Sequence, residues 1–229
     1  LQVADLNIGI LYYFAIAGTG IVGAALAGWA SDNKYSLLGG MRAASQMVSY
    51  EVTLGLTVIG ALMVYGTVRV DEMVRWQAEH TWGLFAQPFA FFLFFAASVA
   101  ESKRIPFDIP EGESEVVAGY FTEYSGIRFL LFFIGEFAAV GAFGAIAATL
   151  FMGGWAVPAA WADLNNNIFN LLGPLILMAK MTLVGGFIFF IRFTMPRFRE
   201  DQLQKLAWTV LIPLSLVNIL ATTILKVAF

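Results

Sequence analysis

Six stretches of mostly apolar residues divide the sequence, and each is close to the length of about 20 residues that a bilayer crossing needs. They cover residues 8–29, 44–67, 84–100, 129–152, 171–191 and 206–227. Strands of a membrane barrel would alternate polar with apolar residues, whereas these stretches are apolar throughout, so helices are expected. The third stretch is the shortest and has Gln87 and Pro88 near its start, so we expect its first turn at the membrane surface. The pattern predicts an all-α polytopic transmembrane bundle that forms a single domain over residues 1–229.

Composition supports a membrane protein and excludes several functions. Hydrophobic residues make up 59% of the chain, charged residues 13%, and the mean hydropathy is +0.77. The net charge of -3 provides no basic patch for nucleic acid. Without cysteine, and with His80 as the single histidine, the chain has no thiolates for an iron-sulfur cluster and no histidine pair for haem. Any electron carrier must therefore belong to a partner.

The basic residues favour one orientation in the membrane. Nine of the 13 Lys and Arg residues lie in the alternate connecting segments 31–43, 101–128 and 192–205. Lys and Arg accumulate on the cytoplasmic side of membranes, so these segments are expected to face the cytoplasm, or the matrix of an organelle. The N-terminal residues would then face outside. The first residues contain no Met and no signal-peptide pattern, so we expect that upstream residues are missing.

The segment 101–128 concentrates acidic residues between two apolar stretches. It holds six of the 16 in the chain, namely Glu101, Asp108, Glu111, Glu113, Glu115 and Glu123. Like charges that crowd together shift one another's pKa values, which suits groups that handle protons or cations. Apolar and aromatic residues alternate with the acids, which indicates a loop folded into the protein. Pro106 and Pro110 preclude a continuous helix from Arg104 to Glu111, and the spacing from Ser114 onward predicts a short helix.

Three ionisable residues lie inside the predicted crossings: Glu51, Glu136 and Lys180. A charge at the bilayer centre costs about 2.5 to 3.5 kcal/mol on insertion scales, so such residues usually mark proton or ion pathways. The alternative is that the two carboxylates only pair with a cation such as Lys180 to hold helices together. For Lys180 itself, a structural counter-ion and a proton relay are both open. The helix of Glu51 also carries a separate polar stripe of Gln46, Ser49, Thr53 and Thr57.

Three sequence blocks carry a resemblance to a known family. They read AESKRIPFDIPEGESEVVAGYFTEYSGIRF, GWASDNKYSLLGGMRAASQMVSYEVTLGL and MPRFREDQLQKLAW. They resemble the quinone-site membrane subunit of proton-pumping NADH:quinone oxidoreductase, called subunit 1 in mitochondrial complex I and the H subunit in bacteria. The resemblance covers essentially the whole chain. That family has eight transmembrane helices, so six here implies that the first two are absent.

The resemblance implies a role for individual residues. The family's acidic pathway from the quinone towards the antiporter-like subunits would use Glu51, Glu101, Asp108, Glu111, Glu113, Glu115, Glu123 and Glu136, and Lys180 falls at a family lysine. The quinone chamber or the support of its loops would involve Arg42, Arg104, Phe107, Tyr124, Arg192, Arg197 and Arg199.

The resemblance also implies a substrate and partners. The substrate would be ubiquinone or menaquinone, with no flavin, haem or iron-sulfur cluster in this chain. Partners would be the peripheral iron-sulfur and quinone-site subunits, the small and antiporter-like membrane subunits, and the lipid of a bacterial inner membrane or mitochondrial inner membrane. Three alternatives are the membrane subunit of an energy-converting hydrogenase or ferredoxin-linked relative, an ion-coupled secondary transporter, and a membrane anchor. A transporter should show inverted repeats, which are not evident, and an anchor would not need charges in its crossings.

Overall fold

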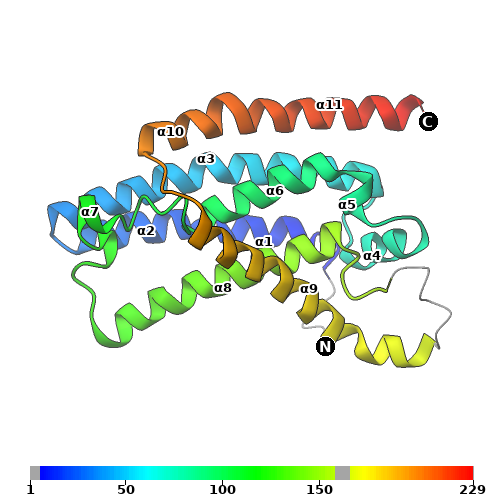
Figure 1. The fold of residues 1–229 in the computed structure, drawn as a ribbon, viewed down its shortest axis with the longest axis horizontal. Coiled ribbons are helices and arrows are strands. Elements are labelled where there is room, and N and C mark those ends of the chain that lie inside the picture. The colour runs from blue at the N-terminus through cyan, green and yellow to red at the C-terminus, as the bar shows by residue number, and fades with distance from the viewer. Residues whose placement is uncertain (1–5, 158–165, 229) are drawn as a thin grey trace.

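The computed structural model describes residues 6–157 and 166–228, and the side chains of residues 113, 114, 166–171 and 228 fall outside that description. The described residues form helices with short connections between them (Figure 1). In chain order these are α1 (Gly9–Ala17), α2 (Thr19–Ala30), α3 (Lys34–Tyr65), α4 (Val70–Glu79), α5 (Gly83–Ala86), α6 (Pro88–Glu101), α7 (Glu113–Val116), the 3₁₀ turn η1 (Gly119–Phe121), α8 (Gly126–Phe151), α9 (Asn166–Thr194), α10 (Glu200–Lys205), the π-helical segment η3 (Leu206–Leu211) and α11 (Ile212–Ala228).

The predicted all-α membrane bundle is confirmed. Among the described residues, five helical segments are long and apolar enough to cross a membrane: Gly9–Ala30, Lys34–Tyr65, Gly126–Phe151, Leu172–Thr194 and Glu200–Val227. They correspond to five of the six predicted stretches. Their outward faces carry large apolar side chains, such as Leu131, Leu183 and Leu220, each about 63% exposed, as a surface against lipid or other membrane helices requires.

The third predicted stretch is interrupted. The helix stops at Gln87 and restarts with Pro88 as the first residue of α6, because proline fits the first turn of a helix but disrupts its interior. The 14 residues of α6 rise only about 21 Å at 1.5 Å per residue. This is shorter than a bilayer core of about 30 Å. The first stretch is divided at Gly18 into α1 and α2, although Gly18 itself keeps helical dihedral angles.

Helix α3 is the centre of the bundle and packs against α2, α6 and α11. Its start is capped by Asn33, whose side chain accepts a hydrogen bond from the Tyr35 amide at 2.9 Å. Its end is set by Gly66, which adopts the left-handed conformation with φ 71°. Helices α8 and α9 pack together as a second pair, and α8 contacts α4, α5 and α6.

Helix α3 and the segment α10–η3–α11 run parallel to each other. Gln204 donates to Ser45 at 2.7 Å, and the Trp208 indole donates to Ser49 at 3.1 Å. At the other end of the bundle, the Lys226 ammonium donates to the Met63 carbonyl at 2.6 Å. Residues of the polar stripe predicted on α3 are buried on this and the neighbouring faces, with Gln46, Ser49, Thr53 and Thr57 all at most 3% exposed.

The acidic loop, residues 101–128, folds onto the end of the bundle where α3 begins and α6 ends, near α7 in Figure 1. Its apolar side chains are buried as predicted, with Phe107 6% and Tyr120 2% exposed. The helix predicted from Ser114 is wrong beyond one turn. Helix α7 ends at Val116 because Val117 is left-handed, with φ 64°. The chain then turns back through η1 to reach α8.

Gly119 makes this fold of the loop possible. Its φ is +55°, and a Cβ there would collide with the carbonyl oxygen of Pro110. A Cβ on Gly39 of α3 would in turn lie 2.6 Å from the Cα of Gly119, so helix and loop backbones touch here. Only glycine allows both the conformation and the approach.

Gly119→Ala is expected to open the acidic loop, because alanine would be strained at this φ and would overlap Pro110. The cost should be about 3 kcal/mol of local stability. Amide hydrogen exchange over residues 104–121 should become faster. The control is Gly55→Ala, since Gly55 of α3 has open space around it. Equal protection in the two variants would contradict this reading of Gly119.

Candidate functional site

Glu136 of α8 is where polar contacts of the acidic loop meet. Its Oε2 lies 3.6 Å from Nη2 of Arg104, and the two side chains are only 11% and 10% exposed. The Tyr120 hydroxyl donates to Glu136 Oε1 at 3.3 Å, and the Lys103 ammonium donates to the Tyr120 hydroxyl at 2.8 Å. A hydrogen-bonded chain therefore runs from Lys103 through Tyr120 to Glu136, with Arg104 as the counter-ion.

Glu111 adds a second carboxyl to this cluster, within hydrogen-bonding reach of Glu136. Burial raises the pKa of Glu111 to about 9, and the adjoining Glu136 carboxyl acts in the same direction. Burial also raises the pKa of Tyr120 and lowers that of Lys103, although the nearby carboxylates oppose the fall for Lys103. The raised pKa keeps the Glu111 carboxyl protonated at neutral pH, where it adjoins Glu136.

The packing of the acidic loop is expected to weaken as the pH rises, and Glu111→Gln should remove much of that dependence. The pKa of Glu111 rises from 4.5 to about 9 on folding, so its stabilising contribution is complete below the lower value. It is lost as the pH rises through the upper one, because the unfolded loop releases the proton first. We expect amide exchange protection over residues 104–121, corrected for intrinsic rates, to fall at least about tenfold across that range in the wild type.

Glu123→Gln is the matched control, because it changes an exposed carboxyl in the same segment. It should keep the wild-type pH dependence. A Glu111→Gln variant whose protection still falls like that of the wild type would show that another group is responsible.

Two cavities adjoin the cluster, and Glu136 lines both. One, of about 560 Å³, lies between α1, α2, α8 and the start of the loop, and Glu101, Lys103 and Tyr120 also line it. The other, of about 390 Å³, has walls of Phe121, Phe129, Phe133 and Phe137 and polar lining from Arg104, Glu111, Glu136 and Arg192. The Arg104 guanidinium stands 4.5 Å from the ring centre of Phe137. The buried Glu136 carboxylate thus lies on the wall of both cavities, beside Glu111 in the aromatic one and Glu101 in the other.

Glu101 lines the larger cavity, and Glu51 continues the acidic series beyond it. Glu101 ends α6 and is 9% exposed, and its Oε2 has no hydrogen-bond partner among the described residues. Glu51 lies within electrostatic reach of Glu101. The Glu51 carboxylate packs against Gly18, at the junction between α1 and α2, where a Cβ would collide with it. The absence of a side chain at Gly18 therefore leaves room for the Glu51 carboxylate.

The connection between α9 and α10 clamps the acidic loop from the side. Arg197 Nη2 lies 3.0 Å from Asp108 Oδ2. The Phe198 amide donates to the Pro106 carbonyl at 3.0 Å, and the rings of Phe198 and Phe107 stack at 5.5 Å. Burial raises the pKa of Asp108 to about 6, although Arg197 pulls it down. Phe107 and Arg197 are thus loop supports in this structure.

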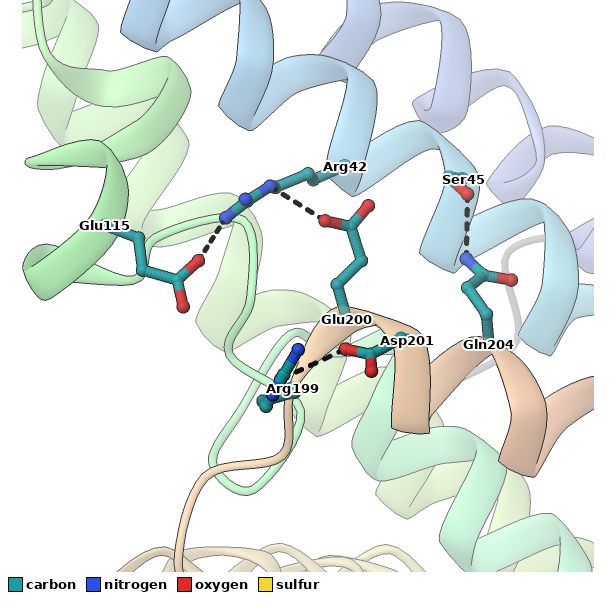
Figure 2. Close-up of polar contacts among 7 residues, drawn as sticks. All are labelled: Arg42, Ser45, Glu115, Arg199, Glu200, Asp201 and Gln204. Atoms are coloured by element: carbon teal, nitrogen blue, oxygen red, sulfur yellow. Dashed lines mark hydrogen bonds and ion pairs between the residues drawn. The ribbon is translucent and has the colours of Figure 1, made fainter.

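Arg42 links the acidic loop to α10 (Figure 2). Its Nη1 lies 2.6 Å from Glu115 of α7, and its Nε lies 3.0 Å from Glu200 of α10. Glu115 is 58% exposed, so this end of the loop faces the surrounding solvent or a partner. Arg199 pairs with its neighbour Asp201 at 3.2 Å, and both are exposed. In the basic segment 192–205, Arg197 therefore pairs with the acidic loop, whereas Arg199 pairs within the segment.

The remaining loop residues lie apart from the cluster. Glu123 is exposed and accepts a hydrogen bond from the Asn33 side chain at 2.7 Å. The Tyr124 hydroxyl donates to the Ala27 carbonyl at 3.1 Å and ties the loop to α2. Glu113 begins α7, and its side chain lies outside the described part. Of the five loop acids whose side chains are described, the structure brings Glu101, Asp108 and Glu111 to the buried end.

Lys180 lies at the opposite end of the bundle from the acidic loop. Its ammonium donates to the carbonyls of Met152, Gly154 and Ala156 at 2.7, 2.9 and 2.8 Å. It also stands 5.0 Å from the ring centre of Trp82. The structure therefore does not bring Lys180 together with the carboxylates. These contacts are those of a cation that fixes the chain beyond the end of α8.

Three residues of the site were missed by sequence reasoning: Lys103, Tyr120 and Gln46. The Gln46 side chain donates to the carbonyls of Ala100 and Phe107 at 2.7 and 2.8 Å, and so holds the start of the loop on α3. The position of Gln46 in the polar stripe could have signalled this. Lys103 and Tyr120 carried no such signal. A tyrosine among apolar residues, as at position 120, is typical of a residue in the hydrophobic core.

Comparisons with known proteins identify the family of the chain. A sequence model of the NADH dehydrogenase family matches residues 2–223. The chain is 47% identical over 223 residues to an NADH-quinone oxidoreductase H subunit of Syntrophobacter fumaroxidans, covering 97% of this chain and 63% of that protein. An NADH-quinone oxidoreductase H subunit of Geobacter metallireducens is also 47% identical, covering 97% of this chain and 64% of that protein.

The corresponding protein of Geobacillus thermodenitrificans is 43% identical, with 99% of this chain and 66% of that protein covered. The chain thus spans slightly less than two thirds of the length of these relatives. Identity at this level along nearly the whole chain establishes common descent, and the chain belongs to the NADH dehydrogenase family, whose members here are NADH-quinone oxidoreductase H subunits.

Proposed function

We propose that this chain forms part of the quinone chamber of a proton-pumping NADH:quinone oxidoreductase and couples quinone reduction to proton movement. The observation that carries the proposal is the position of Glu136, which lines both cavities and is paired with Arg104. The relatives named above are subunits of an NADH-quinone oxidoreductase. The membrane would be a bacterial inner membrane or the mitochondrial inner membrane.

The smaller cavity suits a quinone. Its phenylalanine walls match an apolar tail or ring, and Arg104 and Arg192 supply donors for carbonyl oxygens. Ubiquinone and menaquinone both fit this chemistry. Electrons reach the quinone from an iron-sulfur cluster of a peripheral subunit, since the sequence has no cysteine to hold one.

The acids convert the chemistry into proton movement. Reduction of a quinone to a quinol consumes two electrons and two protons, so charge and proton demand change beside Glu136. The proton on Glu111, which adjoins Glu136, responds to a new charge in the chamber. Tyr120 and Lys103 extend the hydrogen-bonded path into the larger cavity, towards Glu101 and then Glu51.

The exposed parts of the loops are the docking sites for partners. The acidic loop 101–128 and the basic segment 192–205 lie at the same end of the bundle, where Arg42 joins α7 to α10. This end would face the cytoplasm or matrix and receive the peripheral iron-sulfur and quinone-site subunits. The lateral apolar faces would receive the small and antiporter-like membrane subunits and lipid.

Purification of the native complex through a tag on this chain tests the proposal. It should contain a flavin and iron-sulfur arm with NADH:quinone reductase activity. A photoreactive quinone should label the peptide of residues 129–137 in competition with unlabelled quinone. Recovery of a hydrogenase or of a ferredoxin-dependent complex without quinone reduction would overturn it, as would labelling confined to other subunits.

A further inference from the structure

A third cavity, of about 440 Å³, lies at the opposite end of the bundle from the acidic loop. It is formed where α3 and α11 end and α6 begins. Its polar lining comes from Gln87, Asn218, Thr222 and Lys226, and its apolar lining includes Val64, Phe89 and Leu225. None of these residues takes part in the site described above.

Two amide side chains in this cavity have hydrogen-bonding atoms without a partner among the described residues. Gln87 and Asn218 are each 9% exposed, and Gln87 Oε1 and Asn218 Nδ2 make no hydrogen bond there. The other end of the Gln87 amide is engaged, because its Nε2 donates to the Thr222 hydroxyl at 2.8 Å. A buried amide group left without a partner costs about 1 to 3 kcal/mol. One unused donor and one unused acceptor therefore point to a polar ligand.

Positive charge converges on the same place. The N-terminus of α6 opens here, and no side chain caps it. The amides of Phe89 and Ala90 precede the first hydrogen bond of the helix, from Phe91 to Gln87. The helix dipole places partial positive charge at this point and favours an anion. The Lys226 ammonium donates one hydrogen bond to the Met63 carbonyl, and its other two N–H groups can donate to a ligand.

No carboxylate balances this charge among the described residues that line the cavity, where Lys226 is the single ionisable group. The surroundings are apolar and reach the outer surface, with Phe89 43% and Leu225 60% exposed. The cavity also lies at the ends of two membrane-crossing helices, which is the depth of lipid headgroups.

We propose that this cavity binds the headgroup of an anionic phospholipid. The phosphate accepts from Lys226, from Asn218 Nδ2 and from the first amides of α6. A headgroup hydroxyl, as in phosphatidylglycerol, donates to Gln87 Oε1, and an acyl chain lies along Phe89 and Leu225. A zwitterionic lipid such as phosphatidylcholine brings an unpaired cation and no hydroxyl donor, so it binds more weakly.

Photolabelling of the whole complex in nanodiscs tests this inference. Phosphatidylglycerol and phosphatidylcholine are prepared with the same photoreactive acyl chain, and labelled peptides covering residues 85–89 and 218–227 are counted by mass spectrometry. Phosphatidylglycerol should label them several-fold more. Lys226→Gln should reduce this labelling about fivefold, as expected for one lysine near a charged headgroup. Asn218→Leu should reduce it too, and Lys226→Arg should retain it.

The matched control is Lys34→Gln, which removes an exposed lysine at the other end of α3. It should label like the wild type. Equal labelling by both lipids, or unchanged labelling in both Lys226→Gln and Asn218→Leu, overturns the proposal. Absence of any label there would mean that a protein segment covers the cavity, and it overturns the proposal as well. Displacement of the lipid by inorganic phosphate, at an ionic strength matched with chloride, would make the ligand free phosphate and not lipid.

Discussion

Replacement of Glu136 by Gln should reduce proton translocation per electron strongly, by up to about a hundredfold, the lower end of what a positioned proton-transfer group contributes. Glutamine retains the size of the side chain and accepts the Tyr120 hydrogen bond, but it carries no exchangeable carboxyl proton. Electron transfer to quinone in uncoupled membranes should fall much less, because the aromatic walls of the chamber stay in place. The ratio of protons to electrons in inverted vesicles measures the effect.

The control for this variant is Glu79→Gln. Glu79 is an exposed acid of α4 at the other end of the bundle, and its loss should leave the ratio unchanged. A wild-type ratio in the Glu136→Gln enzyme would mean that protons do not pass through this carboxylate.

The second large effect is expected from Arg104→Met. The ion pair between Arg104 and Glu136 is only about one tenth exposed, so the variant leaves a buried carboxylate without its cation. Loss of one member of a buried pair typically costs about 3 to 5 kcal/mol. We expect a lower unfolding temperature of the purified complex, less of the subunit in membranes, and quinone reduction that falls with it.

Arg104→Lys should recover only part of the stability, since lysine lacks the planar group that stands over Phe137. Arg128→Met removes an exposed arginine of the same loop and should change stability by less than about 0.5 kcal/mol. If Arg104→Met and Arg128→Met were equally stable, the pair with Glu136 would not hold the loop.

The broad architecture was predictable because the length of an apolar stretch and the alternation of apolar with polar residues can be seen directly in the sequence. Five of the predicted stretches are long apolar helices, and the loop lies buried as its alternating aromatic residues indicated. The break at Gln87 was harder to predict. Pro88 fits either a kink within one helix or the first turn of a new one, and tertiary contacts decide between them.

Contacts between distant segments were not predictable from residue type. Lys180 could have been a partner of either glutamate in the predicted crossings, yet the backbone carbonyls of Met152, Gly154 and Ala156 take its hydrogen bonds. Val117 was expected to continue a helix, but the close approach of Gly119 to Pro110 requires the chain to turn there. The conformation and contacts at such positions depend on which distant segments of backbone lie in contact. The local sequence pattern does not specify those contacts.

The central claim is that the buried Glu111–Glu136 pair changes its proton occupancy when the neighbouring quinone is reduced. Infrared difference spectroscopy of the complex, recorded between its oxidised and reduced quinone states, observes protonated carboxyl groups directly. We expect a carboxyl signal in the wild type that disappears in Glu136→Gln and shifts in Glu111→Gln, and that persists in Glu79→Gln. An identical carboxyl signal in all four enzymes would contradict the claim.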